Sequence, residues 1–213
     1  GASLGLAFGR IQFTPDLMTS DVMGTHVFDV GSGKFHLKRG PVFTELLLAD
    51  EINRAPAKTQ SALLEAMQER QVSIDGETSA LPATFTVFAT QNPVEHEGTY
   101  PLPEAQLDRF LLKVKVDYPT EQEEDEILSR ASIGVSSQNL DVSSVVSREE
   151  LVALRALAFE VHVDEPVRRY VRDLVRATRS SPLILLGAGP RAGVHLLVAS
   201  RWSAALDGRL FVT

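Results

Sequence analysis

A short apolar run that ends in two acids constrains the fold of this chain more than any other feature. Residues 46–49 are wholly apolar, and Asp50 and Glu51 follow at once. Such a run suits a strand buried in a parallel sheet, although periodicity alone does not exclude a helix. Ligands of open α/β sheets bind outside the carboxyl edge of the strands, where both carboxylates would then lie. One carboxylate there can hold Mg²⁺, and the other can orient or deprotonate a water molecule. The alternative, that both acids only cap the following turn, stays open on this pattern alone.

Further strands are predicted by alternating, β-branched and aromatic segments. The four expected strands are residues 8–13, 45–50, 84–90 and 110–116. Two hairpins are expected as well, one around the turn 31–34 and one around Asp75 and Gly76. Pro56 stands where a helix can begin, and an apolar stripe at helical spacing follows it. Residues 1–118 are therefore expected to form an α/β domain.

The second part of the chain is expected to be helical. Thr120 with Glu123 and Ser147 with Glu150 have the spacing of capping boxes at helix starts. Pro166 and Pro190 each precede apolar residues at helical spacing, and residues 133–147 between the capping boxes are expected to be a loop. We place the domain boundary near Tyr118, which gives a helical domain over 119–213.

Composition excludes several classes of protein. The 213 residues contain no cysteine, so neither a disulfide, a thiolate metal site nor a cysteine nucleophile is possible, and a cytoplasmic location fits. Hydrophobic residues make up 44% and charged residues 23%, which argues against disorder. The net charge of −7 argues against a free-standing nucleic-acid binder. No apolar run reaches the roughly 18 residues of a membrane-spanning helix.

Three more side chains are candidates for phosphate chemistry. Asn92 follows the strand expected at 84–90, where its amide could bond a phosphate oxygen or a water, although Asn-Pro turns are common. Arg109 could reach a γ-phosphate, even in a neighbouring subunit, or be one half of an exposed Asp–Arg pair. Arg191 would lie in the first turn of a helix, where a cation opposes the helix dipole unless phosphate is near. The alternative for Arg191 is an ordinary exposed arginine.

Together these segments, in this order, resemble the MoxR family of the AAA+ ATPases. The matching residues are 10–16, 47–56, 60–69, 89–93 and 98–110. The resemblance is dense over residues 10–118 and looser beyond. It implies the AAA+ fold, with a P-loop-NTPase-like parallel sheet followed by a smaller helical lid.

The resemblance also implies a function and a role for each candidate. Asp50 would hold Mg²⁺ and Glu51 would activate water, as in a Walker B motif. Asn92 would be sensor 1, Arg109 an arginine finger acting in trans, and Arg191 a sensor 2 on the lid. Members of the family are expected to hydrolyse ATP, to form rings that are often hexameric, and to remodel or mature client complexes. Proteins with von Willebrand factor A domains are expected partners.

One element of the family is missing from the sequence. The Walker A loop, G-x-x-x-x-G-K-[ST], would precede residue 10 and is not present. Gly33 and Lys34 do not replace it, because Phe28 stands where the first glycine is needed and Phe35 follows the lysine. We therefore expect the loop in a segment before Gly1, and weak or no ATP binding by the chain as printed. Two alternatives remain. One is a non-catalytic AAA+-derived scaffold, and the other is a nucleic-acid motor, which the acidic net charge disfavours.

Overall fold

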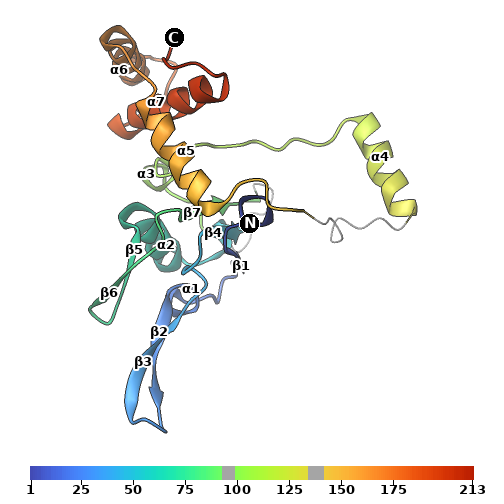
Figure 1. Ribbon diagram of the computed structural model, residues 1–213, viewed down its shortest axis with the longest axis vertical. Coiled ribbons are helices and arrows are strands. Elements are labelled where there is room, and N and C mark those ends of the chain that lie inside the picture. The colour runs from blue at the N-terminus through green and yellow to red at the C-terminus, as the bar shows by residue number, and fades with distance from the viewer. Residues whose placement is uncertain (93–98, 134–141) are drawn as a thin grey trace.

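Three parallel strands form the sheet in the first half of the chain. The computed structural model describes residues 1–92, 99–133 and 142–213. The strands are β1 (Phe8–Gln12), β4 (Leu46–Asp50) and β7 (Thr86–Ala89), in the order β1-β4-β7. Leu47 and Ala49 of the central strand β4 are fully buried, which explains its continuous apolar sequence. The expected α/β fold with a parallel sheet and a helical lid is confirmed (Figure 1).

Helix α2 supplies much of the core against this sheet. Two short helices, α1 (Thr19–Met23) and the 3₁₀ helix η2 (Ile52–Arg54), precede α2 (Ala57–Glu69). Leu63 and Leu64 of α2 are fully buried in one cluster with β4, and Pro56 precedes the first turn as expected. Burying each leucine contributes on the order of 2 kcal/mol. The other face of the sheet is mixed: it carries Arg10 and Gln12, and also Phe8 and Phe88, which are 57% and 60% exposed.

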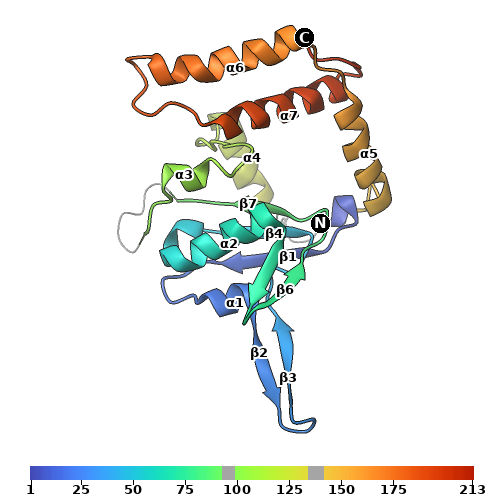
Figure 2. The same cartoon turned by 90° about the vertical axis from the view of Figure 1, so that its left-hand side faces the viewer.

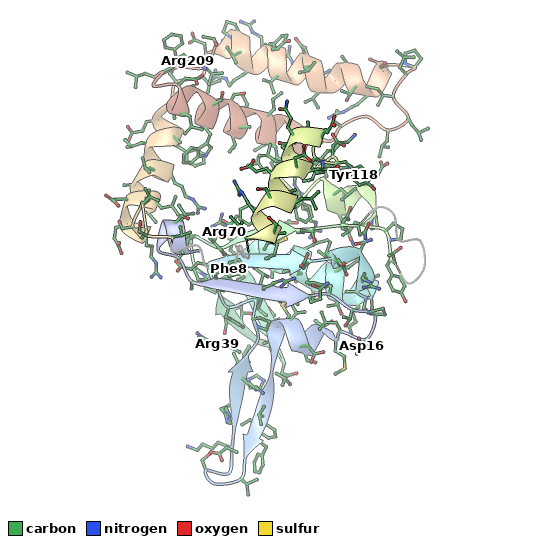
Figure 3. All side chains as sticks on the ribbon, turned by 90° about the vertical axis from the view of Figure 1, so that its right-hand side faces the viewer. Phe8, Asp16, Arg39, Arg70, Tyr118 and Arg209 are labelled. Carbon is green, nitrogen blue, oxygen red and sulfur yellow. The ribbon has the colours of Figure 1, made fainter. Side chains whose placement is uncertain are left out.

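Both expected hairpins are present. They are β2 (Gly24–Asp29) with β3 (Lys34–Arg39), and β5 (Gln71–Ile74) with β6 (Glu77–Ala80). The first projects away from the sheet (Figures 1 and 2), and at its base the Arg39 guanidinium lies 5.1 Å from the centroid of the Phe43 ring (Figure 3). In the second, Asp75 and Gly76 both have positive φ, as a two-residue type I′ turn requires. His26 joins the hairpins through a 2.8 Å contact from Nδ1 to Oδ2 of Asp75.

The prediction of a strand at residues 110–116 is wrong. The structure has a short helix, α3 (Glu104–Leu107), and then an irregular stretch that contains no strand. Val114 and Val116 in this stretch are 79% and 91% exposed, and Tyr118 stands clear of the core (Figure 3). Alternating apolar and polar residues indicate a segment that can join a sheet, but a strand also needs a neighbouring strand for its backbone hydrogen bonds. Within the described residues the segment has none, so the alternation misled the prediction.

The second part of the chain is helical, as expected. Its helices are α4 (Glu121–Ser132), α5 (Arg148–Glu160), α6 (Glu165–Ser180) and α7 (Pro190–Leu206). The reciprocal hydrogen bonds of both capping boxes are present. Helices α6 and α7 lie side by side (Figure 2), with Val171 and Val175 of α6 buried. Much of the loop expected at 133–147 falls on residues 134–141, which lie outside the described part of the chain. Over 1–92, 99–133 and 142–213, none of the helices is long and apolar enough to cross a membrane.

Candidate functional site at the carboxyl edge of the sheet

The two acids lie at the carboxyl edge of the sheet, where the chain turns sharply. Asp50 is the last residue of β4, and Glu51 follows with a left-handed φ of 55° before the buried Ile52. Thr90, just after β7, holds this turn in place. Its hydroxyl accepts a 2.9 Å hydrogen bond from the Glu51 amide, and its carbonyl accepts a 3.0 Å bond from the Ile52 amide. Burial on one side and Thr90 on the other therefore fix both carboxylates at the edge.

Both oxygens of Asp50 accept hydrogen bonds. The Thr90 hydroxyl donates to Oδ1 at 2.5 Å, and the Arg10 guanidinium donates to Oδ2 from Nη2 at 2.6 Å and from Nε at 3.2 Å. The Thr90 hydrogen bond first, and then Arg10, hold the pKa of Asp50 below its ordinary value, against the opposing effect of burial. Asp50 is therefore ionised at neutral pH and aimed along the sheet edge.

Glu51 is held from two sides through a single oxygen. Its Oε2 accepts a 2.9 Å hydrogen bond from Nε2 of Gln12 and a 3.1 Å contact from Nη1 of Arg54. Among the residues that the structure describes, no hydrogen bond to the other oxygen is present, so Oε1 can accept from a water molecule. Glu51 is in this respect placed as a general base would be.

Asn92 lies at the same edge, two residues after Thr90. The buried Asn53, one turn beyond Glu51, donates from Nδ2 to the Asn92 carbonyl at 3.5 Å. The Asn53 carbonyl in turn accepts a 2.6 Å bond from the Tyr100 amide. Asn53 thus contacts both described ends of the segment that carries Asn92. Pro93, the last residue of the predicted Asn-Pro turn, lies outside the described residues.

The two arginines are not brought to the acids. Among the described residues, no hydrogen bond or ion pair joins Arg109 or Arg191 to Asp50 or Glu51. Arg109 follows α3 and lines a hollow of about 340 Å³, together with Glu65, Glu69 and others on α2. Its Nε is buried and has no hydrogen-bond partner in the described part of the chain.

Arg191 lies in the first turn of α7, and this turn lies against the segment that carries Arg109. A Cβ atom added to Gly189 would lie 3.0 Å from Oδ2 of Asp108, so the two segments touch (Figure 2). The structure therefore gives two groups: Asp50, Glu51 and Asn92 at the sheet edge, and the two arginines beside α3.

The side chains that hold the acids were not predicted from the sequence. They are Arg10, Gln12, Arg54 and Thr90, and Asn53, which binds the segment of Asn92, was not predicted either. The signal for two of them was present: Arg10 and Gln12 are two residues apart on a strand, so they share one face of the sheet. Placing that face beside Asp50 requires the pairing of β1 with β4, which sets Gln12 opposite Asp50. The order of parallel strands is not encoded in local periodicity.

The donor set suits magnesium. No group of three or more metal-binding side chains occurs in the described part of the chain. Mg²⁺ in nucleotide sites needs only one or two carboxylates, since phosphate oxygens and water supply the remaining ligands. Oδ2 of Asp50 already binds one positive group, the Arg10 guanidinium at 2.6 Å, so this oxygen lies where a cation can reach it. Asp50 would hold the metal, and Glu51 lies next to it without having to bind.

Comparisons with known proteins agree with the fold. The family model described as "ATPase family associated with various cellular activities (AAA)" matches residues 1–112, and an AAA lid domain model matches residues 176–213. A crystal structure of a candidate ATPase from Cytophaga hutchinsonii ATCC 33406 superposes with a TM-score of 0.86 at 42% identity. It covers 100% of this chain, which in turn covers 66% of that protein.

Relatives of similar sequence point to one branch of this family. Chaperone MoxR1 of Mycobacterium tuberculosis is 46% identical, over 98% of this chain and 57% of its own length. Protein YeaC of Bacillus subtilis is 44% identical, over 99% of this chain and 65% of its own length. Protein MoxR of Paracoccus denitrificans is 30% identical, over 97% of this chain and 67% of its own length. The chain thus spans less than two thirds of the first two relatives. On its sequence, sheet and lid, the chain belongs to the MoxR family of the AAA+ ATPases.

Proposed function

We propose that this protein hydrolyses ATP, by attack of a water molecule on the γ-phosphate at the carboxyl edge of the sheet. One observation carries the proposal: Asp50 and Glu51 converge with the segment of Asn92 on a single hydrogen-bonded turn around Thr90. Such an edge is where open α/β sheets bind ligands. If the two acids only capped the turn, Oε1 of Glu51 would have no need to stay without a hydrogen bond from the described residues.

Each side chain has a proposed part in the reaction. Asp50 binds Mg²⁺, which when bound neutralises the charge of the β- and γ-phosphates. Glu51 orients the attacking water through Oε1 and takes its proton, and the Asn92 amide donates to the γ-phosphate or the water. Arg191 donates to phosphate oxygens from the lid, where the dipole at the start of α7 also favours negative charge.

Arg109 is proposed to serve the site of a neighbouring subunit. Among the described residues, no hydrogen bond or ion pair joins it to Asp50 or Glu51, and it lines an open hollow on α2. A guanidinium supplied across an interface stabilises the charge that develops on the phosphoryl oxygens in the transition state. This arrangement requires a ring, and we propose a hexamer.

The phosphate cradle is proposed to lie in a longer form of the protein. Gly33 and Lys34 lie at the exposed end of the β2–β3 hairpin, far in the fold from the Thr90 turn, so they do not provide it (Figure 1). The division into a nucleotide-binding core over 1–118 and a lid over 119–213 is part of the same proposal. So are a cytoplasmic location, a client complex that is remodelled or matured, and a partner with a von Willebrand factor A domain.

The test measures ATP hydrolysis by a natural form of the protein that carries a G-x-x-x-x-G-K-[ST] loop. Glu51→Gln should lower kcat by about 10²- to 10⁴-fold, as loss of a general base does, while ATP binding is retained. Glu124→Gln on the exposed helix α4 is the matched control and should leave kcat unchanged within twofold. ATP binding without hydrolysis in the unaltered protein would favour the scaffold instead. Stimulation of hydrolysis by DNA or RNA would favour a nucleic-acid motor.

A further inference from the structure

Arg10 is the only described side chain that places a positive charge directly on Asp50. It sits in the middle of β1, two residues before Gln12, and both side chains lie on the face of the sheet opposite α2. The register sets Arg10 opposite Leu48 and Gln12 opposite Asp50. The long Arg10 side chain therefore runs along the sheet toward the carboxyl edge and ends on Oδ2 of Asp50, with two nitrogen donors on this one oxygen.

The two oxygens of Asp50 are held in different ways. Oδ1 is bound by Thr90, whose hydroxyl is itself fixed by the amide of Glu51, so this oxygen belongs to the framework of the turn. Oδ2 is bound by Arg10 alone among the described residues. The Arg10 side chain is 59% exposed, while that of Asp50 is 22% exposed. An exposed guanidinium on a long stem can leave without disturbing the core.

We propose that Arg10 is a positioning residue that occupies Oδ2 of Asp50 until a divalent cation binds there, and then withdraws into solvent. This inference rests on the proposed function, because it assigns Asp50 as the magnesium ligand. Before the metal arrives, the two Arg10 hydrogen bonds keep the carboxylate oriented. Both acceptor positions of Oδ2 are taken by the two Arg10 donors, so a cation that binds this oxygen displaces at least one of them, and the two compete.

The competition should be mild. Exposed ion pairs are weak, so the affinity for the metal should fall by only about two- to fivefold relative to a site without the guanidinium. A weak competitor suits a site that must fill and empty in each cycle.

The first measurement is binding of Mn²⁺ alone, followed by paramagnetic broadening of the amide signals of residues 48–54 in the nucleotide-free protein. Arg10→Gln should bind Mn²⁺ about two- to fivefold more tightly than the unaltered protein. Arg10→Lys should lie between them, because an ammonium keeps the charge but loses the second donor. Asp50→Asn should abolish the broadening. Equal or weaker binding by Arg10→Gln would overturn the proposal.

A matched control separates direct occupancy from the general field of a nearby charge. Arg54→Gln removes one positive charge from the same edge, but Arg54 contacts Glu51 and has no described contact with Asp50. It should strengthen Mn²⁺ binding less than Arg10→Gln does, and an equal effect would overturn the proposal. Circular dichroism checks the fold of each variant, and Arg10→Lys keeps the test decisive if Arg10→Gln does not fold.

A second measurement keeps this inference distinct from the ATPase proposal. In a form with a phosphate-binding loop, Arg10→Gln should lower the Mg²⁺ concentration for half-maximal hydrolysis by about two- to fivefold. An unchanged or higher Mg²⁺ requirement would count against Arg10 as a competitor. If no form of the protein hydrolyses ATP but the Mn²⁺ results hold, the proposed function fails and the role of Arg10 stands.

Discussion

Glu45 and Arg148 form an ion pair of 2.7 Å that joins the start of β4 to helix α5 across 103 positions of sequence. Glu45 immediately precedes β4 and is nearly fully buried, while Arg148 begins α5. The carboxylate also accepts hydrogen bonds from the Thr84 hydroxyl at 2.7 Å and the Ala7 amide at 3.0 Å. One buried carboxylate thus links β4, the segment before β1, the segment before β7 and helix α5.

Removing the arginine should destabilise the protein measurably. Arg148→Gln leaves Glu45 buried with two donors instead of three, and we expect a loss of about 1–2 kcal/mol in the free energy of unfolding. Urea denaturation at neutral pH measures it. Arg130→Gln is the control, since the Arg130–Glu126 pair is exposed and confined to α4, and should change stability by less than about 0.5 kcal/mol. Equal effects of the two substitutions would show that the buried pair does not contribute as described.

The same carboxylate predicts a pH dependence of stability. Burial raises the pKa of Glu45, but the hydrogen bonds from Ala7, Thr84 and Arg148 outweigh it, so the pKa lies below the ordinary 4.5. A carboxyl group with a lowered folded-state pKa stabilises the fold above its unfolded pKa. That contribution is lost as the pH falls through the folded-state value. Glu45→Gln should therefore be less stable at pH 7 and lose less further stability below pH 4.5. Denaturation series at several pH values check this, and parallel curves for the two proteins would contradict it.

Local structure could be predicted from the sequence, whereas contacts between distant elements could not. The strands around Ile11 and Leu47, both hairpins and the capping boxes depend on residues a few positions apart, and all are confirmed. The Glu45–Arg148 pair and the Arg10–Asp50 pair depend on strand order and on where α5 docks, which no local pattern encodes. The error at 110–116 has the same cause, because its alternation is local while its pairing is not.

The candidate site, too, could be predicted from the sequence only in part. The position of Asp50 and Glu51 at the end of a buried parallel strand followed from the apolar run before them, and the structure has them there. The hydroxyl of Thr90, which links the two acids, went unnoticed because a threonine at a strand end has many ordinary explanations. The roles of the acids, Asn92 and both arginines remain predictions that only experiments on the reaction can test.

Thr90 should control the ionisation of Asp50. Its hydroxyl hydrogen bond is the largest cause of the lowered pKa of Asp50, ahead of Arg10. Thr90→Val removes this donor at nearly constant shape, so the pKa of Asp50 should rise toward its ordinary 3.8. Thr90→Ser retains a hydroxyl and should keep the pKa low. Carbon NMR of the labelled aspartate carboxyl groups follows the titration, and an unchanged pKa in Thr90→Val would refute the assignment.

Mixing two inactive variants tests whether Arg109 acts on a neighbouring subunit. Arg109→Ala should lower hydrolysis by about 10³-fold or more if the guanidinium stabilises the transition state, and Glu51→Gln is inactive for a separate reason. In a mixed ring, a subunit with Glu51 intact can sit beside one with Arg109 intact. Such interfaces make up about one quarter of the total in an equal random mixture, so activity should return toward that fraction. Activity that stays as low as in either variant alone, although gel filtration shows mixed oligomers, would mean that Arg109 serves its own chain or none.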